Sequence, residues 1–306
     1  MTTLELRILT LERILHLMKR RTLFLKAICF CLAAAAMLSF CMVTSAAADV
    51  IITPVEVRLD GVPLFEEGQG ALLVDAVTYV PLRAFCNSFG ESDVSWDPID
   101  RSATVKSAGL FITAREGQAY ITVNDRPFYT GRANLLIGGS VYIPVRGIAK
   151  AYGLEVTWQD REGGGLGFAE LASGGKRAEH ASDVYDSEVL YWLSRIISAE
   201  SRGESLAGQI AVGNVVLNRT RAPSFPDTVY DVIFDTKYGV QFTPISNGTI
   251  YDSPAESSII AAKICLEGYS LSDDILYFLN EAISTNMWVS NNRTFIMTLG
   301  NHSFYS

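Results

Sequence analysis

The sequence has few of the side chains that form disulfides or bind metal ions. Its 306 residues include only five cysteines and three histidines. Three of the cysteines lie in the first 48 residues, which leaves Cys86 and Cys265 far apart in the rest of the chain. A disulfide framework is therefore not expected. The sequence contains no HExxH motif, no CxxC pair and no closely spaced histidines, so we expect neither a metal nor any other cofactor.

Motifs for nucleotide binding and serine-dependent hydrolysis are also missing. There is no GxSxG elbow and no Walker loop, and the glycine run "EGGGLGF" lacks both the GxGxxG spacing and a following helix. The formal net charge of the whole chain is −8, and the first 48 residues contain six Lys or Arg and only two Glu. Beyond these residues there is no cluster of positive charge. Because the rest of the chain is strongly acidic, binding to nucleic acid or to an anionic membrane surface is not expected.

The start of the chain has the composition of a secretory signal peptide. In "MKRRTLFLKAICFCLAAAAMLSFCMVTSAAAD" a basic patch precedes an apolar run, and small residues end it at Ala48. We predict that residues 1–48 are removed, that Met18 is an alternative start, and that the mature protein is secreted with no membrane segment. The alternative is an uncleaved anchor, since Ala27 to Val43 approaches the length that spans a bilayer.

An internal repeat follows the predicted signal peptide. The segment "VTYVPLRAFCNSFGESDVSWD" matches "SVYIPVRGIAKAYGLEVTWQD". Upstream, "VRLDGVPL" answers "ITVNDRPF", with turn residues between alternating apolar positions. Each copy predicts a hairpin, a short helix after Pro-x-Arg and a strand ending at the Trp. The equivalent residues are Pro81 and Pro144, Arg83 and Arg146, and Trp96 and Trp158. The arginines either form a binding surface or brace the repeated fold.

The second half is predicted to be mainly helical. In "LYWLSRIISAESRGE" the apolar stripe of Leu190, Leu193 and Ile197 also includes Glu200, near a helix end marked by Gly203. A carboxylate there either has a function, or it snorkels or finds a buried partner. The segment "LAGQIAVGNVVLNR" is apolar almost all round and predicts a central helix. A capping box from Ser253 to Glu256 predicts another helix, ending near Gly268.

Two resemblances join these patterns. The tandem "YVPLR…W" pattern over residues 51–168 resembles the copper amine oxidase N-terminal-like "stalk" domain of exported bacterial proteins, although this region contains no His and so does not indicate copper. The ordered motifs "AESRGE", "GQIAVGNVVLNR", "QFTPISNG", "YFLN" and "GNHSFY", over residues 189–305, resemble the SleB-type cell-wall hydrolases, the family of spore cortex-lytic enzymes. That resemblance implies a lysozyme-like fold, the glycan strand of peptidoglycan as substrate, and Glu200 as the catalytic acid.

We therefore predict an α+β chain, with a tandem-repeat α+β stalk-like domain followed by a mainly α lysozyme-like catalytic domain. The predicted boundaries are residues 1–48 for the signal peptide, 49–170 for the stalk domain, 171–186 for a linker and 187–306 for the catalytic domain. The resemblance places the protein in a bacterial cell wall or spore cortex. The stalk-like domain stands where cortex-lytic members often carry a peptidoglycan-binding module, which puts a spore-specific role in doubt.

Several other residues are candidates for the site. Glu204 is the candidate second carboxylate, with a cap or loop brace as the alternative. His302 is either a proton partner or a structural residue. Weaker candidates for substrate binding, each of which could equally be a packing residue, are Gln241, Phe242, Thr243, Tyr277 and Asn280.

The predicted chemistry is lytic transglycosylation by a single Glu acid/base, because the motif around Glu200 offers only Glu204 as a second carboxylate. In this reaction the C6 hydroxyl of muramic acid attacks its own anomeric carbon. The alternatives are an N-acetylmuramidase-type hydrolase and a non-catalytic wall-binding or adhesion protein, in which an acid on an apolar stripe would have no purpose.

Overall fold

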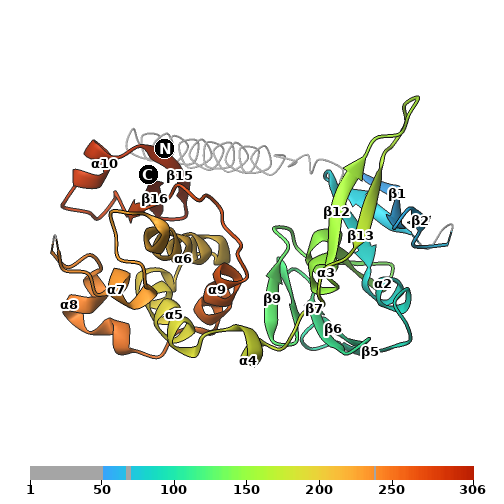
Figure 1. Cartoon of the computed structure of the whole chain (residues 1–306), viewed down its shortest axis with the longest axis horizontal. Coiled ribbons are helices and arrows are strands. Elements are labelled where there is room, and N and C mark those ends of the chain that lie inside the picture. Colours follow the sequence, from blue (N-terminus) through green and yellow to red (C-terminus); the bar gives the residue numbers. More distant parts are fainter. Residues whose placement is uncertain (1–50, 67–69, 238) are drawn as a thin grey trace, which may run out of the picture. The chain divides into compact units, whose positions relative to one another are not determined.

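A computed structural model describes residues 51–66, 70–237 and 239–306 (Figure 1). The predicted signal peptide lies outside these residues. Within them, no helix is both long enough and apolar enough to cross a membrane. The mixed α+β class is confirmed, with a β-rich part first and a largely helical part after it.

The repeat domain, residues 51–173, contains two sheets. The larger has eight strands in the order β10-β11-β4-β3-β1-β13-β12, with β2 paired to β1, and the smaller has five in the order β5-β6-β7-β8-β9. The strands of the larger sheet are β1 (Ile52–Leu59), β2 (Val62–Pro63), β3 (Ala71–Val74), β4 (Val77–Pro81), β10 (Leu135–Ile137), β11 (Ser140–Pro144), β12 (Leu154–Gln159) and β13 (Phe168–Ser173). Those of the smaller are β5 (Ser92–Asp97), β6 (Ser102–Ser107), β7 (Leu110–Arg115), β8 (Tyr120–Val123) and β9 (Arg126–Tyr129).

The predicted hairpins and helices of the two repeats are present. Asp60, Gly61, Asn124 and Asp125 all have positive φ, between 49° and 82°, which is the conformation that two-residue hairpin turns require. Helices α2 (Leu82–Asn87) and α3 (Val145–Ala151) each begin directly after the proline of the Pro-x-Arg motif. Both turn signals and helix starts were therefore readable from local sequence.

The two repeats meet at antiparallel strands β4 and β11. Tyr142 pairs with Pro81, Ile143 with Val80 and Pro144 with Tyr79. Exchanging each residue for its repeat equivalent reproduces the same set of pairs, so the pairing has an approximate two-fold symmetry centred on Val80 and Ile143. Each repeat therefore contributes equivalent elements to the other.

The segment predicted as a linker is attached to the repeat domain over most of its length. Strand β13 continues to Ser173, three residues beyond the predicted boundary of 170. Ala178 is buried, its N–H donates to the Ala151 carbonyl, and its own carbonyl accepts from the Asn124 side chain. His180 is exposed and precedes the short helix α4 (Ala181–Val184). Polar and glycine-rich composition thus marks a connection here, but backbone hydrogen bonds hold it in place.

The C-terminal domain, residues 187–306, is built around three helices (Figure 1). Helix α5 (Ser187–Ser201) packs against α6 (Leu206–Arg221) and α9 (Glu256–Leu266), and α6 packs against α9. The apolar face of α5 and nearly the whole circumference of α6 are buried, as their patterns predict. The smaller elements are α7 (Val229–Ile233), α8 (Thr243–Asn247), the 3₁₀ helix η1 (Thr249–Tyr251), β14 (Tyr277–Leu279), α10 (Trp288–Asn292), β15 (Phe295–Leu299) and β16 (His302–Tyr305).

Helix α9 begins later than the capping box predicts. Its N-cap is Ala255 rather than Ser253, and no side chain caps it. The Ala255 N–H donates to Ser198 Oγ of α5 at 3.0 Å. A hydroxyl from another helix therefore accepts a hydrogen bond at this helix end, where the capping box predicted that Ser253 would be the acceptor. The predicted end near Gly268 is correct, since Gly268 follows the C-cap with φ of 83°.

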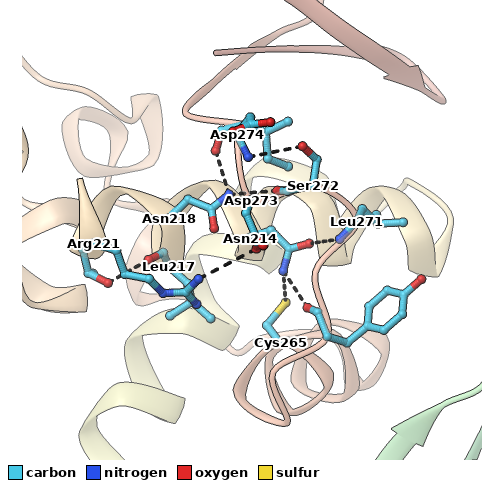
Figure 2. A network of polar contacts seen from close by, with 12 residues as sticks. Asn214, Leu217, Asn218, Arg221, Cys265, Leu271, Ser272, Asp273 and Asp274 are labelled. Carbon is cyan, nitrogen blue, oxygen red and sulfur yellow. Dashed lines mark hydrogen bonds and ion pairs between the residues drawn. The ribbon is translucent and has the colours of Figure 1, made fainter. Parts of the chain in front are cut away.

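Two asparagines of α6 fix the loop that follows α9 (Figure 2). The Asn214 side chain donates to the Tyr269 carbonyl and accepts from the Leu271 N–H, and Asn218 donates to the carbonyls of Ser272 and Ile275 at 3.0 Å each. These amides lie among the buried apolar residues of α6. They replace the water that the loop's backbone groups would lose on burial.

Candidate active site

Glu200 occupies the last turn of α5. The helix starts at the N-cap Asp186, whose carboxylate accepts the N–H groups of Glu188 and Val189, and it ends at Ser201. This length brings Glu200 to the C-terminal end of the buried stripe, on the helix face that the sequence predicts. Its side chain is only partly exposed.

The carboxyl of Glu200 has no hydrogen bond and no ion pair with any residue that the structure describes. Burial raises its pKa to about 7, because desolvation penalises the ionised form and no cation or donor among the described residues offsets that penalty. Such a group holds a proton near neutral pH and can give it to a bound molecule. A structural carboxylate at this depth would be expected to have a partner.

Glu204 lies in the loop between α5 and α6 and is fully engaged. Its carboxylate accepts the Asn301 side-chain amide at 2.8 Å and the Asn301 N–H at 3.2 Å. These hydrogen bonds hold the pKa of Glu204 below its usual value, so the group is ionised at neutral pH. The same carboxylate lies where a side chain at Gly300 would project, with Oε2 only 1.8 Å from an added Cβ. Glu204 therefore joins this loop to the turn between β15 and β16.

His302 is a buried neighbour of Glu204. Its Nδ1 lies 4.0 Å from Glu204 Oε1, and burial lowers the pKa of the imidazole in spite of the opposing effect of that carboxylate. The ring is therefore neutral at pH 7 and packs edge-on against Phe278, with centroids 5.4 Å apart. The structure thus places Glu204 and His302 together, and no hydrogen bond or ion pair joins Glu200 to either of them.

The candidates around α8 have different environments. Gln241 donates locally to the Gly239 carbonyl, and Thr243 is exposed at the first position of α8. Phe242 is 2% exposed and belongs to the hydrophobic core of the domain. Helix α8 and η1 lie against α5, so this segment is next to the helix that carries Glu200.

Tyr277 and Asn280 lie at the two ends of the β14 region. Asn280 accepts the Ala282 N–H with its side chain and forms the turn that follows β14. The ring of Tyr277 has the guanidinium of Arg293 at 4.5 Å and that of Arg219 at 5.5 Å from its centroid. Both residues have structural contacts here, and whether either binds substrate stays a prediction.

Arg219 is a central residue that the sequence patterns did not single out. It is 5% exposed, its Nε donates to the Leu276 carbonyl at 2.8 Å, and its guanidinium lies over the rings of Phe225 and Phe242. Desolvation lowers its pKa to about 10, which still leaves it charged at neutral pH. The only signal was its place at the end of "VVLNR", on a helix with no exposed face.

Both halves of the chain match known families. Residues 203–305 match the family model described as Cell Wall Hydrolase, and residues 58–163 match that of the Copper amine oxidase N-terminal domain. Glu200 lies just before the first of these matched ranges. Among the described residues, no group of three or more His, Cys, Asp or Glu side chains could hold a metal ion.

Several proteins similar to this chain are spore cortex-lytic enzymes. That of Bacillus cereus is 29% identical over 203 residues, which cover 58% of this chain and 77% of that protein. That of Oceanobacillus iheyensis is 32% identical over 146 residues, which cover 48% of this chain and only 51% of that protein. The solved catalytic domain of the germination-specific lytic transglycosylase SleB from Bacillus anthracis is 34% identical, with 40% of this chain and 97% of that domain covered and a TM-score of 0.37.

The C-terminal domain is thus that of an enzyme that degrades cell walls. This domain matches the cell wall hydrolase family, and the proteins similar to the chain include spore cortex-lytic enzymes. The prediction of a SleB-type domain behind a copper amine oxidase N-terminal-like domain is confirmed, and the alternative of a non-catalytic adhesion protein is not supported.

Proposed function

We propose that this enzyme cuts the glycan strand of peptidoglycan by lytic transglycosylation, with Glu200 as the single catalytic acid and base. The observation that carries the proposal is the carboxyl of Glu200, which is partly buried, has no partner among the described residues and has a pKa of about 7. A general acid is most effective when its pKa lies near the working pH, since it is then both protonated and ready to donate.

The first step uses Glu200 as a proton donor. Its carboxylic acid protonates the oxygen of the glycosidic bond after N-acetylmuramic acid, and the bond from that oxygen to the anomeric carbon breaks with the electron pair leaving on oxygen. Glu200 becomes a carboxylate beside the positively charged sugar ring that forms. The leaving sugar departs with a free hydroxyl.

The second step needs a nucleophile, and Glu204 is a poor source of one. Its two hydrogen bonds from Asn301 and its lowered pKa are the features of a structural brace. We therefore assign the nucleophile to the substrate. The C6 hydroxyl of muramic acid forms a bond to the anomeric carbon while the Glu200 carboxylate accepts its proton. This returns Glu200 to the acid form and leaves a 1,6-anhydro end, with no water consumed.

Glu200→Gln tests the role of this residue. The amide keeps the shape of the side chain but cannot give up a proton, so cleavage of isolated peptidoglycan sacculi should fall by about two to four orders of magnitude. Glu188→Gln is the matched control, because it makes the same change at an exposed position of α5 and should leave activity unchanged. A Glu200→Gln enzyme with near-normal activity would remove Glu200 from the mechanism.

We also propose that the protein is exported to the wall it cleaves, and that export removes the first 48 residues. The support is the basic patch, the apolar run and the small residues before Ala48. N-terminal sequencing of the protein recovered from the wall fraction tests this. An intact N-terminus on membrane-bound protein would favour the anchor instead.

A further inference from the structure

The repeat domain has two grooves at equivalent places. The first groove has a volume of about 590 Å³ and is lined by Arg83 and Trp96, and the second has a volume of about 250 Å³ and is lined by Arg146 and Trp158. In each, the arginine comes from the first turn of the short helix and the tryptophan from the strand that follows it.

The hairpin of the other repeat closes each groove. Residues 139–142 line the first groove and the equivalent residues 76–78 line the second. This exchange follows from the symmetric pairing of β4 with β11. The two grooves are therefore lined by equivalent elements of the two repeats. The differences between their side chains indicate which groove is free to bind a ligand.

In the second groove the side chains already have partners. Arg146 Nη1 donates to the Val156 carbonyl at 3.1 Å, and Trp158 Nε1 donates to Asp160 at 3.1 Å. The Trp158 ring also lies against Gly167, where an added Cβ would be 2.8 Å from the indole. Here the arginine braces α3 against β12, as the structural interpretation of the repeated arginine requires.

In the first groove the equivalent groups have none. Arg83 is exposed, and the side chains of Arg83 and Trp96 make no hydrogen bond, ion pair or ring contact with the residues that the structure describes. Yet Trp96 is 41% exposed, the same fraction as Trp158. The fold therefore does not require this arginine for bracing, and the larger groove keeps an unpaired guanidinium beside an unstacked indole.

The rest of the first groove offers a carboxylate, an amide and hydroxyls, from Glu66, Asn87, Ser95 and Ser140. This is a set of groups suited to a sugar. An indole face covers the apolar C–H face of a pyranose ring, amides and carboxylates bond its hydroxyls, and a guanidinium pairs with a carboxylate substituent. Muramic acid with its peptide carries carboxylates, unlike a neutral polysaccharide.

We propose that the first groove is a second glycan-binding site, which holds the chain on the peptidoglycan that its C-terminal domain cleaves. Trp96 stacks on a sugar ring, and Arg83 pairs with a carboxylate of the muramyl peptide. The choice of ligand rests on the proposed function, and the existence of the site does not.

Binding of the full-length protein to sacculi in pelleting assays tests this, with the Glu200→Gln background to limit digestion. Trp96→Ala should lower the affinity at least about tenfold, as loss of an aromatic anchor does, whereas Trp158→Ala removes an equally exposed indole and should change it less than about twofold. Trp96→Phe, which keeps an aromatic face, should restore most of the binding. Thermal melting of each variant checks that it is folded.

Equal losses for Trp96→Ala and Trp158→Ala, or no loss for Trp96→Ala, would overturn the proposal. Arg83→Ala should weaken binding to whole sacculi but not to insoluble chitin, which lacks carboxylates, and equal weakening for both would refute the role of Arg83. Because pelleting measures attachment rather than cleavage, these results are distinct from any failure of the catalytic proposal. If Trp96→Ala kept its affinity for sacculi but lost binding to another wall protein, the proposal would be overturned and the groove would be assigned to a protein partner.

Discussion

Glu204 and Asn301 are joined by two hydrogen bonds, one from the Asn301 side-chain amide at 2.8 Å and one from its backbone N–H at 3.2 Å. The pair links the loop after α5 to the turn between β15 and β16, across 97 residues of sequence. These hydrogen bonds distinguish Glu204 from Glu200, which lies four positions earlier in "AESRGE" and whose carboxyl has no hydrogen bond with any described residue. One is free to exchange a proton, and the other holds the chain in position.

Glu204→Ala should therefore act on stability more than on catalysis. Removing the acceptor should cost about 1 kcal/mol of unfolding free energy, since Asn301 is exposed and water can replace part of the contact. The fall in kcat should be less than about tenfold, well short of that expected for an acid catalyst. Urea denaturation and a sacculus turbidity assay measure the two effects, with Glu188→Ala as the exposed control. A kcat loss as large as that of Glu200→Gln would place Glu204 in the chemistry.

The pH dependence of activity should follow the proton on Glu200. The reaction starts from the carboxylic acid, and a pKa of about 7 means that the protonated fraction falls tenfold for each pH unit above it. We expect kcat/KM on sacculi to be constant below pH 7 and to fall above it. The fall in kcat/KM above pH 7 should remain in His302→Asn, because the imidazole of His302 is already neutral at these pH values. A rate that rises through pH 7 would contradict the acid role.

The pH dependence of the unfolding free energy should report the raised pKa of Glu200 independently of any activity measurement. The pKa of Glu200 is raised on folding from 4.5 to about 7, so folding stability is lost as pH rises between these values. Glu200→Gln removes this loss and should be more stable than the unmodified protein at pH 8, by on the order of 1 to 3 kcal/mol. At pH 4.5 the two should differ little. Urea denaturation at both pH values tests this, and an equal effect at both would mean that burial does not perturb Glu200.

The C-terminal domain should remain active when separated from the repeat domain. A truncated protein that begins near Ser182 keeps every catalytic candidate. It loses Arg126, which donates to both oxygens of Glu267 at 2.7 and 2.8 Å, but keeps Tyr185, which donates at 2.5 Å. The Glu267 side chain is 4% exposed in the full-length protein and would meet water in the truncated one.

Glu267→Gln tests the contact between Arg126 and Glu267 when it is made in the full-length protein and, as a control, in the truncated protein, which lacks Arg126. In the full-length chain it leaves the partly buried Arg126 guanidinium without its charged partner and should cost about 1.5 to 3 kcal/mol. In the truncated protein it should be nearly neutral. Denaturation curves give the comparison, and an insoluble or inactive truncated protein beside an active full-length one would refute the independence of the domain.

Local patterns were sufficient for much of this structure. The turns at Asp60-Gly61 and Asn124-Asp125, the helices after Pro81 and Pro144, and the position of Glu200 on its stripe all depend on residues within one or two helical turns or on a short repeat. The raised pKa of Glu200 also follows from that stripe, because an apolar surrounding is enough to cause it.

Contacts between distant segments were not predictable in the same way. Asn301 caps no helix and shares no period with Glu204, so nothing in the sequence connects them. The Ala255 N–H at the N-cap of α9 donates to the Ser198 hydroxyl of α5. The backbone N–H and carbonyl of Ala178 are hydrogen-bonded to the repeat domain, in the segment where composition predicted a linker. In each case a tertiary partner satisfies a group that local rules assign to solvent or to a cap.

The central claim is that Glu200 works alone and the substrate supplies the nucleophile. It is tested most directly by mass analysis of the muropeptides that the purified enzyme releases from sacculi. The account predicts 1,6-anhydro-muramoyl ends, which lack one water relative to reducing ends, and predicts that Glu200→Gln releases neither. Predominance of reducing muramic acid ends would contradict it, because water would then be the nucleophile and a second carboxylate would have to activate it.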